Sequence, residues 1–197
     1  DGSGEWLELD IAKLPPSFQV GGFTYTFANQ ADVLVNTRIA ASAAGATPMD
    51  RPEWGAVNPK NGEVYFTMTN NGSRRVVDGL APNGSPQYAT DAANPRAYAD
   101  QDGSGQGNPN GHIIRFKESA QTPSTATAFE WDIFLFGAES ATNPQTNLSG
   151  LTAANDFSSP DGLWFSQATG ICWIQTDDGA FTDKSNCMLL AAIPGTV

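Results

Sequence analysis

The stretch PEWGAVNPKNGEVYFTMTNN, residues 52–71, predicts a β-hairpin, because it indicates a strand, a tight turn at Asn61-Gly62 and a second strand. A second stretch, PDGLWFSQATGICWIQTDD, residues 160–178, follows the same plan 108 residues further on. In both, a glycine lies nine residues after the acidic residue and an aromatic residue lies twelve after it. Repeated hairpins of this kind are typical of the radial blades of a β-propeller.

Short apolar runs bounded by Gly, Pro, Asn or Asp recur along the rest of the chain and predict an all-β fold. Further strands are expected at residues 23–27, 112–116, 129–136, 163–165, 171–176 and 187–192. One short helix is expected over residues 31–44, with Asp32 near its start and Gly45 just past its end. The polar, Gly- and Pro-rich segments 78–94 and 99–111 are expected to be long surface loops.

The charge balance limits the partners of this chain. Its 197 residues carry 10 Lys plus Arg against 21 Asp plus Glu, a formal net charge of −11. This balance argues against nucleic acid as a partner, because phosphate backbones are bound by dense Lys and Arg. A small phosphorylated substrate would require bound cations, which can reverse the local charge of a site.

The ends and the hydropathy of the sequence bear on its location. No stretch approaches the roughly 20 apolar residues of a membrane helix, so no membrane span is expected. The chain opens Asp-Gly-Ser-Gly, with neither Met nor an apolar signal segment. We therefore expect a fragment or a processed chain, in which a site can be incomplete.

The segment DRPEWG, residues 50–55, holds the sharpest candidates for chemistry. Pro52 disfavours a helical conformation at Arg51, which we expect to be extended. Since residues two apart in an extended chain face the same side, Arg51 and Glu53 should point together. That pair offers a guanidinium for a phosphate oxygen and a carboxylate for a metal. An ordinary exposed ion pair at a strand start is the alternative.

Two further carboxylates occupy comparable places. Asp161 repeats the Pro-acid element of Pro52-Glu53, and Asp177 follows an apolar strand. Together with Glu53 they are hard oxygen ligands, which suit Ca²⁺ or a mixture of iron and calcium better than a cysteine-rich zinc site.

Other residues with possible chemistry have plainer explanations. Cys172 and Cys187 could form a disulfide or remain free thiols. His112, the one histidine, is expected to be a packed or surface residue rather than a catalytic base. Residues 100–105 resemble the opening of a calcium loop, but position twelve is Gly111 where an EF-hand has Glu.

Several strings resemble the C-terminal half of PhoX-type alkaline phosphatases, in that family's order and over most of the chain. They are MDRPEWGAVNPKNGEVYFTMTNN from Met49, NPRA from Asn94, GHIIRF from Gly111, FEWDIFLFG from Phe129 and SPDGLWFSQATGICWIQTDDG from Ser159.

This resemblance implies that residues 1–197 form a single region, about half of a six-bladed propeller, with a cluster of Fe³⁺ and Ca²⁺ that hydrolyses phosphomonoesters. By motif, Arg51 would contact phosphate, Glu53 would bind metal and contribute to catalysis, and Asp161 and Asp177 would bind calcium. The family's iron-binding cysteine belongs to the N-terminal half, which would be a separate chain or missing. A periplasmic or secreted location is implied.

Two other functions remain open at this stage. The chain could be a non-catalytic, calcium-stabilised propeller module, because propellers host many functions. It could also belong to a propeller hydrolase of the phosphodiesterase or lactonase type, which shares the calcium-bound channel and differs in substrate.

Overall fold

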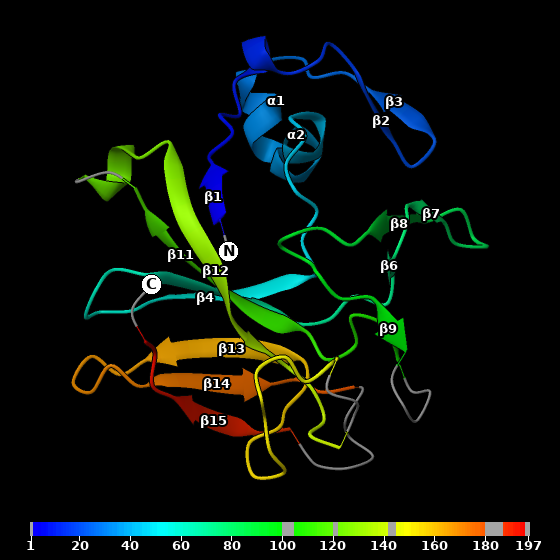
Figure 1. Ribbon diagram of the computed structural model, residues 1–197. Helices are drawn as coiled ribbons and strands as arrows, with labels where there is room; N and C mark the ends of the chain where they lie inside the picture. The colour runs from blue at the N-terminus through cyan, green and yellow to red at the C-terminus, as the bar shows by residue number, and fades with distance from the viewer. Residues whose placement is uncertain (1, 100–104, 120–121, 142–144, 180–186, 196–197) are drawn as a thin grey trace. The chain divides into compact units, whose positions relative to one another are not determined.

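A computed structural model describes residues 2–99, 105–119, 122–141, 145–179 and 187–195 (Figure 1). Its strands are β1 (Gly2–Glu5), β2 (Phe18–Val20), β3 (Phe23–Tyr25), β4 (Pro52–Val57), β5 (Val64–Met68), β6 (Arg74–Arg75), β7 (Gly79–Leu80), β8 (Pro86–Ala89), β9 (Tyr98–Ala99), β10 (Gln106–Gly107), β11 (His112–Glu118), β12 (Ala128–Phe136), β13 (Pro160–Phe165), β14 (Cys172–Thr176) and β15 (Leu189–Ala192). Its helices are α1 (Gln30–Val35) and α2 (Thr37–Ala43), with 3-10 turns at Ile11–Lys13 and Pro123–Thr125. Contacts divide the chain into a unit of Glu5–Pro48 and a unit of Asp1–Gly4 with Met49–Val197.

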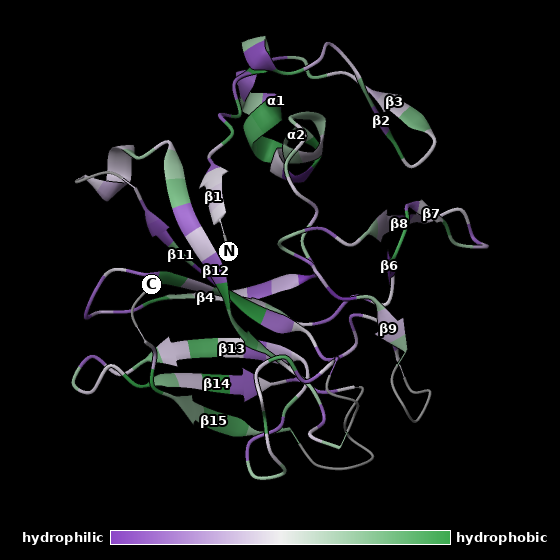
Figure 2. Ribbon diagram, viewed as in Figure 1, coloured by the Kyte–Doolittle hydropathy of each residue, from purple (hydrophilic) through white to green (hydrophobic). Residues whose placement is uncertain are grey.

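The unit Glu5–Pro48 combines the hairpin of β2 and β3 with the two helices. Its core consists of the buried residues Leu14, Phe27, Val33 and Ala40. The helix α1 is rich in hydrophobic residues (Figure 2), and it begins after Asn29, whose side-chain oxygen accepts a hydrogen bond from the Asp32 amide.

The prediction of one helix over residues 31–44 was wrong, because the helix is interrupted at Asn36. Asn36 has φ −103° and ψ 42°, outside the helical region. Its side-chain amide donates to the Asp32 carboxylate at 2.7 Å. An asparagine that bonds locally in this way competes with the helical ladder, so two short helices replace one.

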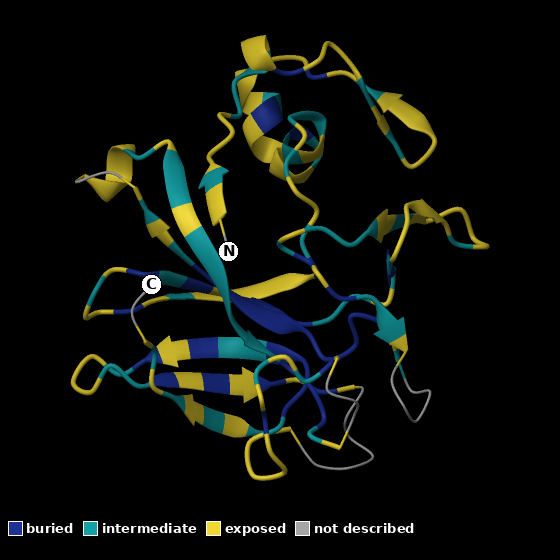
Figure 3. Cartoon of the chain, in the orientation of Figure 1, coloured by how far each residue is buried: buried dark blue, intermediate teal, exposed yellow. Residues whose placement is uncertain are grey.

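The larger unit is built mainly from antiparallel strand pairs, with β6 and β8 paired in parallel, so the expected all-β class is confirmed. One sheet has the strand order β1-β12-β11-β5-β4, and a second has the order β13-β14-β15. A cluster of buried residues contributed by both sheets forms the core. It contains Tyr65, Ile113, Leu163, Phe165, Cys172 and Ile174. Burial is greatest along the central strands, whereas β4 at the sheet edge is largely exposed (Figure 3).

The predicted repeat is present at atomic detail in β4–β5 and β13–β14. Pro52 pairs with Met68, and Pro160 pairs with Thr176; the register then shifts by a bulge at the same place in each hairpin. The tight turns also match. The Gly62 amide donates to the Asn58 carbonyl at 2.9 Å, and the Gly170 amide donates to the Ser166 carbonyl at 2.8 Å. Sequence spacing therefore identified a true structural duplication.

The described residues contain no closed ring of sheets, so the half-propeller remains a prediction. The segments 78–94 and 99–111, expected to be surface loops, contain the short strands β7, β8, β9 and β10. Asn94 and Asn108 within them are fully buried. The surface-loop prediction was therefore wrong at Asn94 and at residues 107–111, which are buried, whereas residues 78–93 are exposed or partly buried.

Candidate functional site

The two hairpins begin at residues with unusual backbone conformations. Arg51 has φ 54° and Ser159 has φ 49°, and these are the non-glycine residues with positive φ among those the structure describes. Each immediately precedes a strand-opening proline. The carbonyl of each accepts a backbone bond from the residue 18 positions later, namely Thr69 at 3.1 Å and Asp177 at 3.0 Å.

This conformation corrects one expectation and leaves another in place. Arg51 is left-handed and not extended, so the geometric reason given for pairing it with Glu53 was wrong. The two side chains nevertheless approach each other, with Arg51 Nη2 lying 3.6 Å from Glu53 Oε1. Both groups are well exposed, so this ion pair by itself contributes little to stability.

A single threonine joins the acidic starts of the hairpins. The Thr67 hydroxyl donates to the Asp161 carbonyl at 2.7 Å and accepts from the Trp54 amide at 2.9 Å. Trp54 directly follows Glu53 in the chain. Because Thr67 is fully buried, the two acid-bearing strand starts are fixed next to each other.

The electrostatics show that the predicted site residues share one environment. The pKa of Asp161 is raised, first by burial and then by the negative charges of Glu53 and Asp177, while Arg51 opposes the rise. Three side chains, those of Glu53, Asp177 and Arg51, thus influence the carboxyl group of Asp161. Three carboxylates against one guanidinium leave the cluster negative, and such a cluster repels an anionic substrate unless cations are bound.

The donor chemistry suits a hard cation, but these side chains do not complete a coordination sphere. Carboxylate oxygens are the ligands that calcium and iron accept. Among the residues that the structure describes, no group of three His, Cys, Asp or Glu lies close enough to hold a metal ion. This chain accordingly offers separate carboxylates rather than a finished cage. The calcium-loop candidate at 100–105 lies, except for Gly105, outside the described residues.

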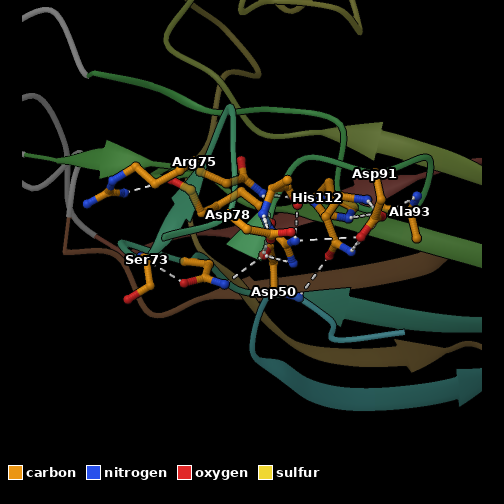
Figure 4. Close-up of polar contacts among 12 residues, drawn as sticks. Asp50, Ser73, Arg75, Asp78, Asp91, Ala93 and His112 are labelled. Atoms are coloured by element: carbon orange, nitrogen blue, oxygen red, sulfur yellow. Dashed lines mark hydrogen bonds and ion pairs between the residues drawn. The ribbon is translucent and has the colours of Figure 1, made fainter. Parts of the chain in front are cut away.

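A buried polar network that the sequence did not indicate surrounds Asp50, the residue before Arg51 (Figure 4). Its centre is Asp50, which is fully buried and lies 2.8 Å from Arg74 Nη2. Asp50 also accepts hydrogen bonds from the side chains of Asn71 at 2.8 Å and Asn108 at 3.0 Å. Its own amide donates to Asn94 at 2.9 Å. The residue before Arg51 is therefore anchored in the interior.

His112 belongs to the same network and is a packed residue, as expected. Its ring nitrogens contact the Asn108 side chain and the Ala93 carbonyl, at 3.0 and 2.9 Å. Burial, followed by repulsion from the Arg96 guanidinium, lowers the pKa of His112 to about 3. The imidazole is therefore neutral at physiological pH.

Both described cysteines are free, which resolves the alternative that the sequence left open. Cys172 is buried in the core, and burial raises the pKa of its thiol to about 12. Cys187 is exposed, and its sulfur accepts a hydrogen bond from the Asp178 amide. Cys172 is thus an unreactive packing residue.

Fold and site together define a mostly β protein that presents an acidic cluster with one arginine at the start of two duplicated hairpins. The chain belongs to the alkaline phosphatase PhoX family, whose sequence model matches residues 1–196. It is also similar to the solved structure of Pseudomonas fluorescens PhoX in complex with vanadate, a transition state analogue. That similarity has 34% identity and a TM-score of 0.70.

The match to the Pseudomonas fluorescens structure covers 96% of this chain and 30% of that one, so this chain spans under a third of its length. No curated protein matches this sequence. Within the described residues, no helix is both long and apolar enough to cross a bilayer.

Proposed function

We propose that this chain supplies part of the active site of a metal-dependent alkaline phosphatase that hydrolyses phosphomonoesters. The observation that carries this proposal is that Arg51, Glu53 and Asp161, at the starts of two duplicated hairpins, share one electrostatic environment with Asp177, which ends the second hairpin. Membership of the PhoX family supports the same activity.

In this proposal Arg51 donates N–H groups to the phosphoryl oxygens of the substrate. A guanidinium is suited to this task, because its donors form a planar fork that matches phosphate geometry. Its charge opposes the negative charge that builds up on the phosphoryl group as the ester bond breaks.

Glu53, Asp161 and Asp177 would hold iron and calcium, which, when bound, neutralise the phosphoryl charge and activate a nucleophile. The pKa of Asp161 is raised first by burial and then by repulsion from Glu53 and Asp177, and this second cause supports the role. A bound cation would remove that repulsion. Ligands from elsewhere would complete the coordination, since this chain gathers no three-ligand set among its described residues.

We also propose that further blades cover the edge strands β4 and β13 to complete a six-bladed propeller in the periplasm or outside the cell. Trp54 and Trp164 on these strands are 54% and 66% exposed. They line an apolar groove together with Val57 and Phe66. Exposed edges and apolar surface of this kind favour coverage by further structure.

The test is an assay of the purified protein, with every polypeptide it contains, on a chromogenic phosphomonoester at alkaline pH. We expect iron and calcium by elemental analysis, loss of turnover with a chelator, and at least a 100-fold loss (about 2.7 kcal/mol) in Glu53→Gln. Glu130→Gln, which removes an exposed carboxylate from β12, is the charge-matched control and should keep its activity.

Three results would contradict the proposal. Protein without bound metal would exclude the phosphatase. A change in the Tm of Glu53→Gln, with no turnover to lose in the wild-type protein, would favour the calcium-stabilised binding module. Preference for a phosphodiester or a lactone would favour the other class of propeller hydrolase.

A further inference from the structure

The Arg51 guanidinium has a hydrogen-bonding partner whose position suggests a role. Arg51 Nη1 donates to Asn70 Oδ1 at 2.7 Å. Of the five N–H donors of the guanidinium, this is the one hydrogen-bonded within the described residues, because Glu53 at 3.6 Å lies beyond hydrogen-bond distance. The Asn70 contact therefore sets the direction of the donors that remain.

Asn70 itself is fixed from the other hairpin. Its side-chain amide donates to Ser159 Oγ at 3.2 Å. Ser159 is fully buried, and its backbone amide donates to the Asn110 carbonyl at 3.1 Å. The residue before Asn70, Thr69, donates its amide to the Arg51 carbonyl. Asn70 is thus restrained through its own side chain and through the backbone bond of its neighbour Thr69.

The side-chain contacts form one chain from a buried serine to an exposed guanidinium. It starts at Ser159, two residues before Asp161, passes through Asn70 and ends on Arg51, two residues before Glu53. Arg51 is 59% exposed, so without such a contact its long side chain would sample many rotamers. A planar donor fork recognises phosphate only when it is held in one orientation.

We propose that Asn70 is a positioning residue, which holds the Arg51 guanidinium in the orientation needed to receive the phosphoryl group. This inference rests on the phosphatase function proposed above and adds to it a residue that does not touch the substrate. Asn70 acts through Arg51, and Ser159 acts through Asn70. The predicted consequence is energetic coupling between positions 70 and 51.

The experiment is a double-mutant cycle in the intact, metal-loaded protein, using Asn70→Ala, Arg51→Lys and the double variant. We expect Asn70→Ala to lower kcat/KM about 10-fold to 100-fold, the range for one hydrogen bond to a charged group. In the Arg51→Lys background the same substitution should change kcat/KM less than about threefold, because no guanidinium remains to be positioned. Inhibition by inorganic phosphate should weaken in parallel with kcat/KM.

Three controls separate positioning from folding. Asn83→Ala changes an exposed turn asparagine and should leave kcat/KM within about twofold of the wild-type value. Ser159→Ala keeps the Arg51–Asn70 hydrogen bond, so its kcat/KM should lie between the values of the wild type and of Asn70→Ala. Metal content and Tm of Asn70→Ala should stay near those of the wild type.

Additive effects in the cycle, or an unchanged kcat/KM in Asn70→Ala, would overturn this inference while leaving the phosphatase proposal in place. A wild-type protein that binds phosphate and hydrolyses no phosphoester under any metal condition would overturn both.

Discussion

Asp50 offers the sharpest test of how the interior supports the site. The perturbation is Asp50→Asn, which keeps the size of the side chain and removes its charge. Asp50 is fully buried, and the Arg74 side chain beside it is 1% exposed. The substitution therefore leaves a guanidinium inside the protein without its carboxylate at 2.8 Å, although Arg74 Nη1 still lies 3.5 Å from Asp91.

The expected magnitude follows from these contacts. Breaking a buried ion pair on one side costs about 3–5 kcal/mol, because the remaining charge is uncompensated. Asp50 also accepts from Asn71 and Asn108, whose amides would face an amide group in place of a carboxylate. The partial compensation by Asp91 places the expected loss near 3 kcal/mol, a large part of the roughly 5–15 kcal/mol stability of a domain.

The assay is urea unfolding followed by tryptophan fluorescence, with Asp50→Asn, Arg74→Met and their double variant. We expect the double variant to lose about 1–3 kcal/mol less than the sum of the single losses, since it leaves neither charge unpaired. Arg38→Met, an exposed change on α2, should stay within about 0.5 kcal/mol of wild type. Single losses below about 1 kcal/mol, or an additive cycle, would show that the Asp50–Arg74 pair does not stabilise the interior.

Three further predictions concern pH and backbone. The pKa of His112 is lowered to about 3 in the folded state, so its ring should not titrate by NMR between pH 8 and 5. For the same reason the free energy of unfolding should fall as pH drops from about 6.5 toward 3, and it should fall less steeply in His112→Asn. Because the pKa of Asp161 is raised, the metal-free protein should lose stability as pH rises above about 4. Asp161→Asn should therefore raise Tm by about 1–3 °C at neutral pH, whereas the control Glu130→Gln should leave Tm unchanged. Gly111 has φ +65°, and a Cβ there would lie 2.1 Å from the Thr69 carbonyl oxygen. Gly111→Ala should therefore lower the free energy of unfolding more than Gly84→Ala, which introduces only the left-handed strain of about 1 kcal/mol. Equal losses in the two variants would contradict this.

The parts of the fold that sequence could predict are those written in local patterns. The hairpin of residues 52–71 is specified by turn chemistry at Asn61-Gly62 and by apolar strands, and the same spacing recurs from Pro160. Register follows once both strands and the turn are known, which is why the matching bulges could form at equivalent places. Glu53 and Asp161 were singled out correctly as equivalent positions for the same reason.

The parts that sequence could not predict depend on tertiary partners. Asn94 and Asn108 lie in segments whose composition is typical of surface loops, yet Asp50 draws both into the interior. A polar composition predicts that these asparagines are exposed, but it does not show that hydrogen bonds to a buried aspartate will satisfy their side chains in the interior. The helix break at Asn36 likewise depends on which groups its side chain finds.

The left-handed backbone at Arg51 and Ser159 connects the predictable and the unpredictable parts. Left-handed φ costs a non-glycine residue roughly 1–2 kcal/mol, and the following prolines restrict both residues further. Such strain persists only where surrounding contacts over-determine it, and it gathers at functional sites. Here the contacts are a backbone bond to each carbonyl and, one residue before Arg51, the buried Asp50 anchor. The same two strained residues carry the guanidinium and the hydroxyl that Asn70 joins, so the interior network and the orientation of the Arg51 side chain are parts of one arrangement.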